Sequence, residues 1–220
     1  MCVIIHKPAN ISIDDTILRL CWDANKDGAG FMYSDNGKLI VKRGYMKYKR
    51  FKSAYLPVED KEMVIHFRWA SCGDVSPTMC HPFKVNEDLA MVHNGHIDIP
   101  YLMKDHESDT VWLVKNIFRE FPKDFLCSAY NNAYHKIISM SIKGSVMVFM
   151  DNNSNVIKVG ERGRNGMNFA GCWFSNGFWL MNKNVNIVNI SQIKYVLEDR
   201  EVENAATESH LQTQICSSSG

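Results

Sequence analysis

Short apolar runs bounded by turn residues alternate along the chain with segments of helical periodicity. Such runs, too short for a helix and rich in β-branched or aromatic residues, predict strands. In the first half of the chain they cover residues 2–5, 31–34, 38–43, 63–69 and 89–93. Asn36 and Gly37 separate the second run from the third, so these two runs are predicted to pair as a hairpin.

Hydrophobic residues at three- and four-residue spacing predict helices in the segments between these runs. A first helix is expected at 13–23, with Ser12 as its N-cap, and weaker helical character covers 47–56. Ser108 is expected to cap a second clear helix, and a further helix is predicted at 123–135. The apolar face of the helix after Ser108 comprises Val111, Val114, Ile117, Phe118 and Phe121.

From residue 137 onward the pattern is mostly that of strands separated by turns rich in Asn and Gly. Strands are predicted at 145–150, 156–160, 168–175, 178–181, 184–190 and 192–197. Residues 201–220 are polar and predict a flexible tail. The order of strands, helices and strands, with no repeat or linker, predicts one α+β domain with layered sheets at residues 2–200.

Composition narrows the class of protein. The chain has 220 residues, of which 45% are hydrophobic, enough for a sizeable core, so disorder is excluded as its main state. Its 25 basic residues balance 24 acidic ones, which leaves no positive excess for binding nucleic acid. No apolar run approaches the roughly 20 residues of a membrane helix, and no signal peptide is expected. We expect a soluble cytoplasmic protein whose seven cysteines are reduced.

Cys2 is the first candidate for chemistry because it directly follows the initiator methionine. Removal of Met1 would place a thiol and a free α-amino group on one residue. An α-amino group, with a pKa of about 7.7–8.0, can act as general base for its own thiol. The alternative is an ordinary buried cysteine in a core strand.

Three further positions carry suitable chemistry at the ends of predicted elements. Arg68 lies at the C-terminal edge of a predicted strand and could hold a carboxylate by two hydrogen bonds, or form a surface ion pair. Asn94 and Gly95 follow another strand and could supply two donors to an oxyanion, or form a simple turn. Asp109 begins a helix, where it could bind an ammonium group or serve only in the helix cap.

Taken together, these residues belong to short motifs in a characteristic order. The motifs are MC at the N-terminus, DGAGF at 27–31, HFRWAS at 66–71, HPF at 81–83, HNG at 93–95 and SDT at 108–110. They resemble the class II glutamine amidotransferases over residues 2 to about 120, and more loosely to 182. The resemblance implies an N-terminal-nucleophile (Ntn) hydrolase with a four-layer αββα fold.

The resemblance also implies a role for each candidate. Cys2 would attack the side-chain amide of glutamine, and its α-amino group would pass the proton to departing ammonia. Asn94 and Gly95 would form the oxyanion hole. Arg68 would bind the α-carboxylate of glutamine and Asp109 its α-ammonium group. Trp69 and His93 stand beside these residues and would shape the pocket, although core packing explains them as well. No cofactor and no metal are implied.

The chain departs from the family pattern in places. Cys72 occupies a position that is often histidine, and the glycines common after the nucleophile are absent. Biosynthetic members fuse this domain to a synthase, whereas this chain resembles the stand-alone members of bacteria and phages. Glutamine is therefore the expected substrate, and a separate synthase protein is the expected acceptor of ammonia. Neither a membrane nor nucleic acid is expected as a partner.

Three other functions are weighed against this one. Metal binding would use Cys72, Cys80, His81, His93 and His96, but their spacing lacks the pairs typical of zinc sites. A different Ntn amidase would share the nucleophile, but Arg68 and the SDT motif favour an amino-acid substrate. An inactive binding module could use the basic, aromatic segment 42–52 to contact single-stranded nucleic acid, although a solvated surface explains this segment equally simply.

Overall fold

The computed structural model describes residues 1–99, 106–126, 133–160 and 166–181, which belong to one compact unit, Met1–Asn182. The predicted strands at 184–190 and 192–197 and the predicted tail at 201–220 lie outside the described residues. The expected domain boundary at residue 200 therefore stays a prediction. Within the described ranges, no helix has the length and apolar character needed to cross a membrane.

A six-stranded antiparallel sheet contains the N-terminal strand near its centre, in the order β3-β2-β4-β1-β10-β9. Its strands are β1 (Val3–Lys7), β2 (Ala29–Asp35), β3 (Lys38–Tyr45), β4 (Met63–Phe67), β9 (Met167–Phe169) and β10 (Cys172–Phe174). In the ladders that flank β1, Val3 is opposite Phe67 of β4 and Ile5 is opposite Phe174 of β10. The residue before β1 therefore lies beside the segment that leaves β4.

A second sheet has four antiparallel strands in the order β5-β6-β7-β8. They are β5 (Phe83–Lys84), β6 (Leu89–Asn94), β7 (Val146–Asp151) and β8 (Val156–Val159). A buried cluster joins the inner faces of the two sheets, because it takes side chains from both of them. It contains Ile4, Met32, Leu39, Val64, Ala90, Val92, Val146, Val148, Met150 and Trp173.

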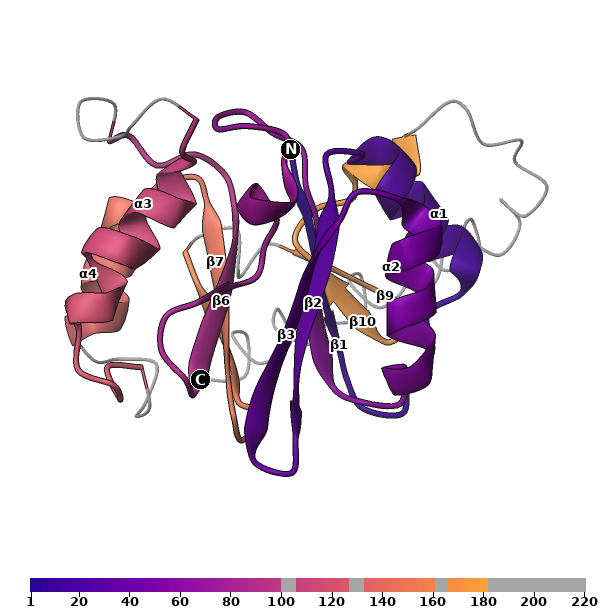
Figure 1. Ribbon diagram of the computed structural model, residues 1–220, viewed down its shortest axis with the longest axis horizontal. Helices are drawn as coiled ribbons and strands as arrows, with labels where there is room; N and C mark the ends of the chain where they lie inside the picture. The colour runs from indigo at the N-terminus through magenta and orange to yellow at the C-terminus, as the bar shows by residue number, and fades with distance from the viewer. Residues whose placement is uncertain (100–105, 127–132, 161–165, 182–220) are drawn as a thin grey trace, which may run out of the picture. The chain divides into compact units, whose positions relative to one another are not determined.

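Helices cover the two outer faces (Figure 1). On the six-stranded sheet lie α1 (Asp15–Ala24) and α2 (Tyr48–Tyr55), and on the four-stranded sheet lie α3 (Asp109–Asn116) and α4 (Ala133–Ser141). Phe51 of α2 packs its ring 5.0 Å from that of Phe67, between centroids. The cluster under α3 and α4 includes Val114, Ile138 and Phe149. The four-layer αββα fold class is thereby confirmed, as are the Asn36–Gly37 hairpin and the strands of the first half.

Short 3-10 helices complete the described chain: η1 (Leu56–Val58), η2 (Pro77–Met79), η3 (Phe118–Glu120) and η4 (Phe178–Met181). The strand predicted at 178–181 is wrong, since η4 occupies it. Asn176 shapes this turn by accepting a hydrogen bond from the backbone N–H of Phe178 through its side-chain oxygen, at 3.2 Å.

Two helix predictions need correction. Asp14, rather than Ser12, caps α1, because its carboxylate accepts a 2.7 Å hydrogen bond from the Thr16 amide. The helix predicted at 123–135 is wrong over its first residues. The Phe125 amide closes a turn onto the Pro122 carbonyl at 3.1 Å, and the described residues of α4 are Ala133–Ser141.

The single strand predicted at 168–175 is instead a hairpin. Ala170 and Gly171 have φ angles of 49° and 75°, and this left-handed turn separates β9 from β10. The apolar residues on both sides of the turn hide it, because Phe169 and all of β10 are buried.

Candidate active site

Cys2 lies directly before β1, beside the segment that follows β4. The Trp69 amide donates a hydrogen bond to the Cys2 Sγ at 3.3 Å, and the thiol lies 3.4 Å from the Trp69 carbonyl oxygen. On the β10 side, the Asn176 side chain donates to the Cys2 carbonyl at 2.8 Å. Neighbours on both sides thus fix the backbone and the thiol of Cys2.

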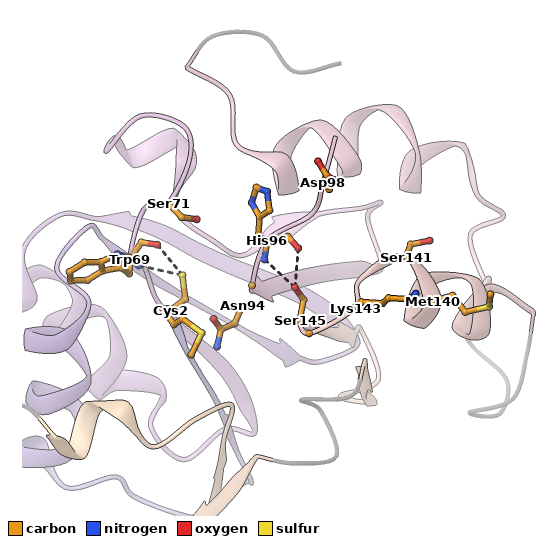
Figure 2. A pocket seen from close by; sticks show the side chains of 13 residues that line it. Cys2, Trp69, Ser71, Asn94, His96, Asp98, Met140, Ser141, Lys143 and Ser145 are labelled. Carbon is orange, nitrogen blue, oxygen red and sulfur yellow. Dashed lines mark hydrogen bonds between the residues drawn. The ribbon is translucent and has the colours of Figure 1, made fainter. Parts of the chain in front are cut away.

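Asn94 ends β6 in the opposite sheet, and its side chain points toward Cys2 (Figure 2). Its Nδ2 donates a 2.9 Å hydrogen bond to the Ser175 hydroxyl, which also accepts the Ile4 amide at 3.0 Å. An amide nitrogen carries two hydrogens, so one remains for a substrate oxygen. Ser175 therefore connects the strand that begins at Cys2 to the predicted oxyanion donor.

Position 95 requires glycine, both for its backbone conformation and for the closeness of a neighbouring side chain. Its φ of 148° is one that side chains rarely adopt, and a Cβ atom here would collide with the Ser145 hydroxyl. That hydroxyl accepts a hydrogen bond from the His96 amide and donates one to the His96 carbonyl, both at 3.1 Å. Ser145 thus holds the turn that presents the Gly95 backbone.

An open cavity of about 690 Å³ adjoins Cys2 (Figure 2). The predicted residues Cys2, Trp69, Asn94 and Gly95 line it at one end, and Met140 belongs to its far wall. Trp69 is 54% exposed and Met140 is 73% exposed, so the rim presents large apolar surfaces. The nucleophile candidate and both oxyanion candidates therefore share one solvent-accessible space.

A second cavity behind Cys2 measures only about 20 Å³. It is lined by Cys2, Arg68, Trp69, Gly95, His93 and Asp109, among others. Such a volume holds about one water molecule. The two cavities together include every residue that the sequence predicted for the site, but the space next to Arg68 and Asp109 is narrow.

Backbone groups of the protein form hydrogen bonds with the two charged candidates, Arg68 and Asp109. The buried Arg68 guanidinium donates to the carbonyls of Cys72 at 3.0 Å and Asp74 at 2.7 Å. The buried Asp109 carboxylate accepts from the amides of Ile97 at 2.8 Å and Thr110 at 2.6 Å. In this conformation both side chains organise the loops around them.

Burial also sets the electrostatics of Cys2. Removal from water raises the pKa of the thiol, while the Trp69 amide, the positive N-terminus and the Arg68 charge act in the opposite direction. The net effect keeps the thiol protonated at neutral pH. A base close to the sulfur is therefore needed to make it a nucleophile.

Three buried histidines stand behind the site. His93 contacts the Thr110 hydroxyl through Nδ1 at 2.9 Å, and its carbonyl lies 3.1 Å from the His66 Nε2. The His81 ring lies 4.2 Å from that of His66, between centroids. Burial lowers the pKa of His66 to about 3 and that of His93 to about 4. Neutral imidazoles therefore form the wall behind Arg68 and Asp109.

Sequence reasoning missed the supporting side chains, namely Ser145, Ser175 and Asn176. The partners that make them important lie 49 to 174 residues away. Only the position of Ser175 at the end of the strand predicted at 168–175 was a signal, and it does not identify Asn94 as the partner.

The αββα layers, with a cysteine at the start of a central strand, define an Ntn-hydrolase-like fold. Among solved structures, the fold is similar to that of a glutamine phosphoribosylpyrophosphate amidotransferase from B. subtilis complexed with ADP and GMP. The two chains share 16% sequence identity at a TM-score of 0.47, over 79% of this chain and 41% of the other. The chain thus spans less than half the length of that enzyme. No family model and no curated protein matches the sequence.

Proposed function

We propose that this protein hydrolyses the side-chain amide of glutamine, with Cys2 as an N-terminal nucleophile after removal of Met1. One observation carries the proposal. The Cys2 thiol shares an open cavity with Asn94 and Gly95, although the three residues come from the facing ends of two different sheets. This is the arrangement that acyl transfer needs, a nucleophile opposite oxyanion donors.

The proposed reaction has two stages. The Cys2 sulfur forms a bond to the amide carbon of glutamine, and its proton passes to the freed α-amino group. That group protonates the leaving nitrogen, so the carbon–nitrogen bond breaks. Ammonia departs, and the acyl group stays on the Cys2 sulfur as a thioester. Water then attacks the thioester, the carbon–sulfur bond breaks, and glutamate leaves as the thiol recovers its proton. Asn94 and Gly95 would stabilise the oxyanion at both stages.

Substrate selection is assigned to Arg68 and Asp109. A free amino acid is a zwitterion, and a buried cation and anion behind the nucleophile match its two charged groups. The Arg68 guanidinium already donates to the carbonyls of Cys72 and Asp74, so the carboxylate of glutamine would compete with these two carbonyls for it. We infer that the segment 70–76 moves outward when glutamine binds. Trp69 and His93 then form the walls beside the substrate.

A second candidate function is hydrolysis of a longer amide by the same nucleophile. The observation that favours it is the contrast in volume between a cavity of about 690 Å³ and one of about 20 Å³. A substrate that extends past Met140 could use the larger space without opening the smaller one. In either case, transfer of the ammonia to an acceptor protein would require a partner.

The experiment combines mass spectrometry with product analysis. Intact mass first establishes whether Met1 is removed. Release of ammonia and glutamate from glutamine is then measured for the wild type, for Cys2→Ala and for Cys80→Ser. Cys80 is a buried thiol that lines neither cavity, so its variant is the matched control. We expect Cys2→Ala to abolish release while Cys80→Ser retains it.

A glutamine analogue that carries an electrophilic ketone should add once, at Cys2. An active enzyme that retains Met1, or an adduct on Cys72 in place of Cys2, would contradict the proposed nucleophile. Labelling of Cys2 without release of ammonia from glutamine would leave the nucleophile in place and favour the longer amide.

A further inference from the structure

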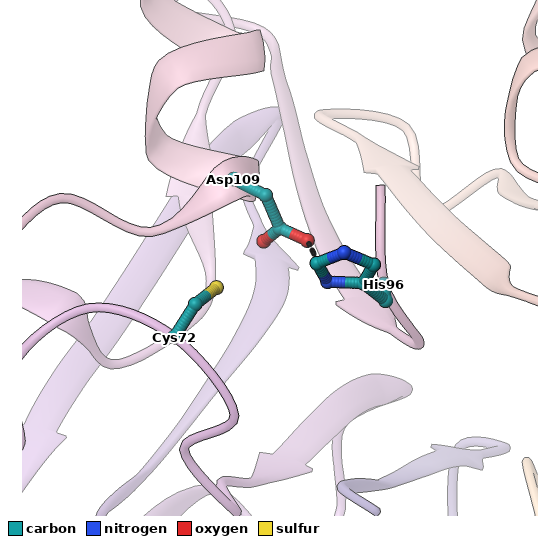
Figure 3. Close-up of side chains that lie close together, drawn as sticks. All are labelled: Cys72, His96 and Asp109. Atoms are coloured by element: carbon teal, nitrogen blue, oxygen red, sulfur yellow. Dashed lines mark ion pairs between the residues drawn. The ribbon is translucent and has the colours of Figure 1, made fainter. Parts of the chain in front are cut away.

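Cys72, His96 and Asp109 bring three different donor atoms together at the boundary between the two cavities (Figure 3). Their sulfur, nitrogen and oxygen atoms all lie within 4.8 Å of one another. The His96 Nδ1 is 3.7 Å from the Asp109 Oδ2, and the Cys72 sulfur points toward the same carboxylate. Cys72 and His96 were among the metal-binding candidates of the sequence, whereas Asp109 was not. The three residues come from the loop after β4, the turn after β6 and the start of α3.

This donor set matches zinc. Zinc binds thiolate at about 2.3 Å, imidazole at about 2.0–2.1 Å and carboxylate at about 2.0–2.2 Å, most often in a tetrahedron. Donors of a tetrahedral site lie about 3.3–3.7 Å apart by that geometry, so the observed cluster needs only a small contraction. Magnesium and calcium prefer sets made of oxygen alone. A thiolate therefore selects against both.

The side chains can reach a metal without unfolding. The side chain of His96 is 67% exposed, which leaves it free to turn toward a metal, and Cys72 lies in an irregular loop. The Asp109 Oδ2 accepts one amide hydrogen bond, from Ile97, and an oxygen of this type can accept two partners. Three protein ligands leave a fourth position, open to water or substrate.

We propose that Cys72, His96 and Asp109 form a zinc site that regulates the enzyme by blocking the Asp109 end of its substrate pocket. The inhibitory effect rests on the proposed function, whereas the binding does not. A zinc ion on Asp109 occupies the carboxylate assigned to the ammonium group of glutamine. Zinc and glutamine therefore compete for one side chain.

Zinc binding releases a proton. The Cys72 S–H bond breaks, the sulfur binds the metal, and the proton passes to solvent. Zinc affinity should therefore increase as the pH rises from 6 toward 9, as expected for a thiolate ligand.

The test titrates zinc into the full-length protein in competition with a chromophoric chelator of known affinity, without glutamine. We expect one site in the wild type, and no competition by magnesium. Cys72→Ser and His96→Gln should each weaken zinc binding by more than the roughly 10–100-fold that loss of an outer-shell partner costs. Cys80→Ser and His106→Gln serve as matched controls, since neither residue belongs to the cluster.

The Cys2→Ala variant distinguishes zinc binding at the cluster from zinc binding by the Cys2 thiol. Retained affinity in Cys2→Ala, together with loss in Cys72→Ser and His96→Gln, supports the site. Loss of affinity only in Cys2→Ala, or unchanged affinity in both cluster variants, would overturn it. Circular dichroism of each variant shows that the fold is kept.

The catalytic arm measures inhibition of ammonia release by zinc at increasing glutamine concentration. Inhibition should be competitive in the wild type and weakened in His96→Gln. Zinc binding at the cluster with non-competitive inhibition would overturn the blocking mechanism. If the wild type releases no ammonia, the chelator titration still decides the metal site, so failure of the proposed function is distinguishable from failure of the zinc site.

Discussion

Replacing Ser175 by alanine should disturb both stability and catalysis, because one hydroxyl connects the two sheets at the site. Ser175 is buried, and its Oγ accepts the Ile4 amide at 3.0 Å and the Asn94 Nδ2 at 2.9 Å. Alanine removes this acceptor without adding volume. Two buried donors are then left without it, one on β1 and one on the predicted oxyanion residue.

The magnitude follows from the cost of an unsatisfied buried donor, about 1–3 kcal/mol. The Ile4 amide has no access to solvent, whereas Asn94 adjoins the open cavity, where water can replace part of the lost bond. We therefore expect Ser175→Ala to lower the free energy of unfolding by about 2–4 kcal/mol. Loss of an oxyanion donor costs about 100–1,000-fold in kcat, so a displaced Asn94 should cost at least roughly tenfold.

Urea unfolding and steady-state kinetics measure the two effects. Ser53→Ala is the control, because Ser53 is exposed on α2 and bonds only within its own helix; its effect should stay within about 0.5 kcal/mol. In a double-mutant cycle with Asn94→Ala, the losses in kcat should be far from additive. A loss of stability below about 0.5 kcal/mol with unchanged kcat would refute the connecting role of Ser175.

Three further predictions concern the surroundings of the site and the fold. Gly95→Ala should cost about 1–3 kcal/mol in urea unfolding and most of the ammonia release, because a Cβ at φ 148° meets the Ser145 hydroxyl; near-normal activity would contradict the close approach. His66, His81 and His93 have folded pKa values below the ordinary 6.5, so the unfolded chain binds more protons and stability should fall as the pH drops from about 6.5 toward 4. Each histidine contributes about 1.4 kcal/mol per pH unit to the slope of the unfolding free energy against pH. Measured from pH 7.5 to 5.0, this slope should be shallower for His81→Phe; an unchanged slope would exclude His81 as a source of the pH dependence. Asp14→Ala should destabilise the protein by about 1 kcal/mol while Ser12→Ala changes little, since Asp14 caps α1 and Ser12 does not; equal effects would contradict the cap.

The sequence was most informative where local pattern and local structure coincide. The apolar runs near residues 2–5 and 89–93 became central strands, because buried strands must be apolar on both faces. The candidate residues fell at the ends of those strands, where a chain leaves the sheet and its side chains become accessible. The position of Cys2, Arg68 and Asn94 at strand ends could therefore be predicted without coordinates, while their roles stay predictions.

Two kinds of feature could not be predicted from the sequence. The turn at Ala170–Gly171 lies within an apolar segment, so hydrophobicity alone could not reveal it. Contacts between distant segments are the second kind. Ser175 with Asn94, and Cys72 with His96 and Asp109, meet only because two sheets stack and their strand ends converge. The spacing of residues along the chain does not reveal which strand ends converge.

The small volume of the second cavity follows from the same donors that would bind glutamine. Arg68 makes two charged hydrogen bonds to the loop carbonyls of Cys72 and Asp74, worth about 1.5–3 kcal/mol each. A carboxylate that replaces them offers two oxygens in the bidentate geometry that guanidinium prefers. The exchange would therefore cost little. A substrate without an α-carboxylate gains nothing from opening the loop, so this exchange would discriminate glutamine from simple amides.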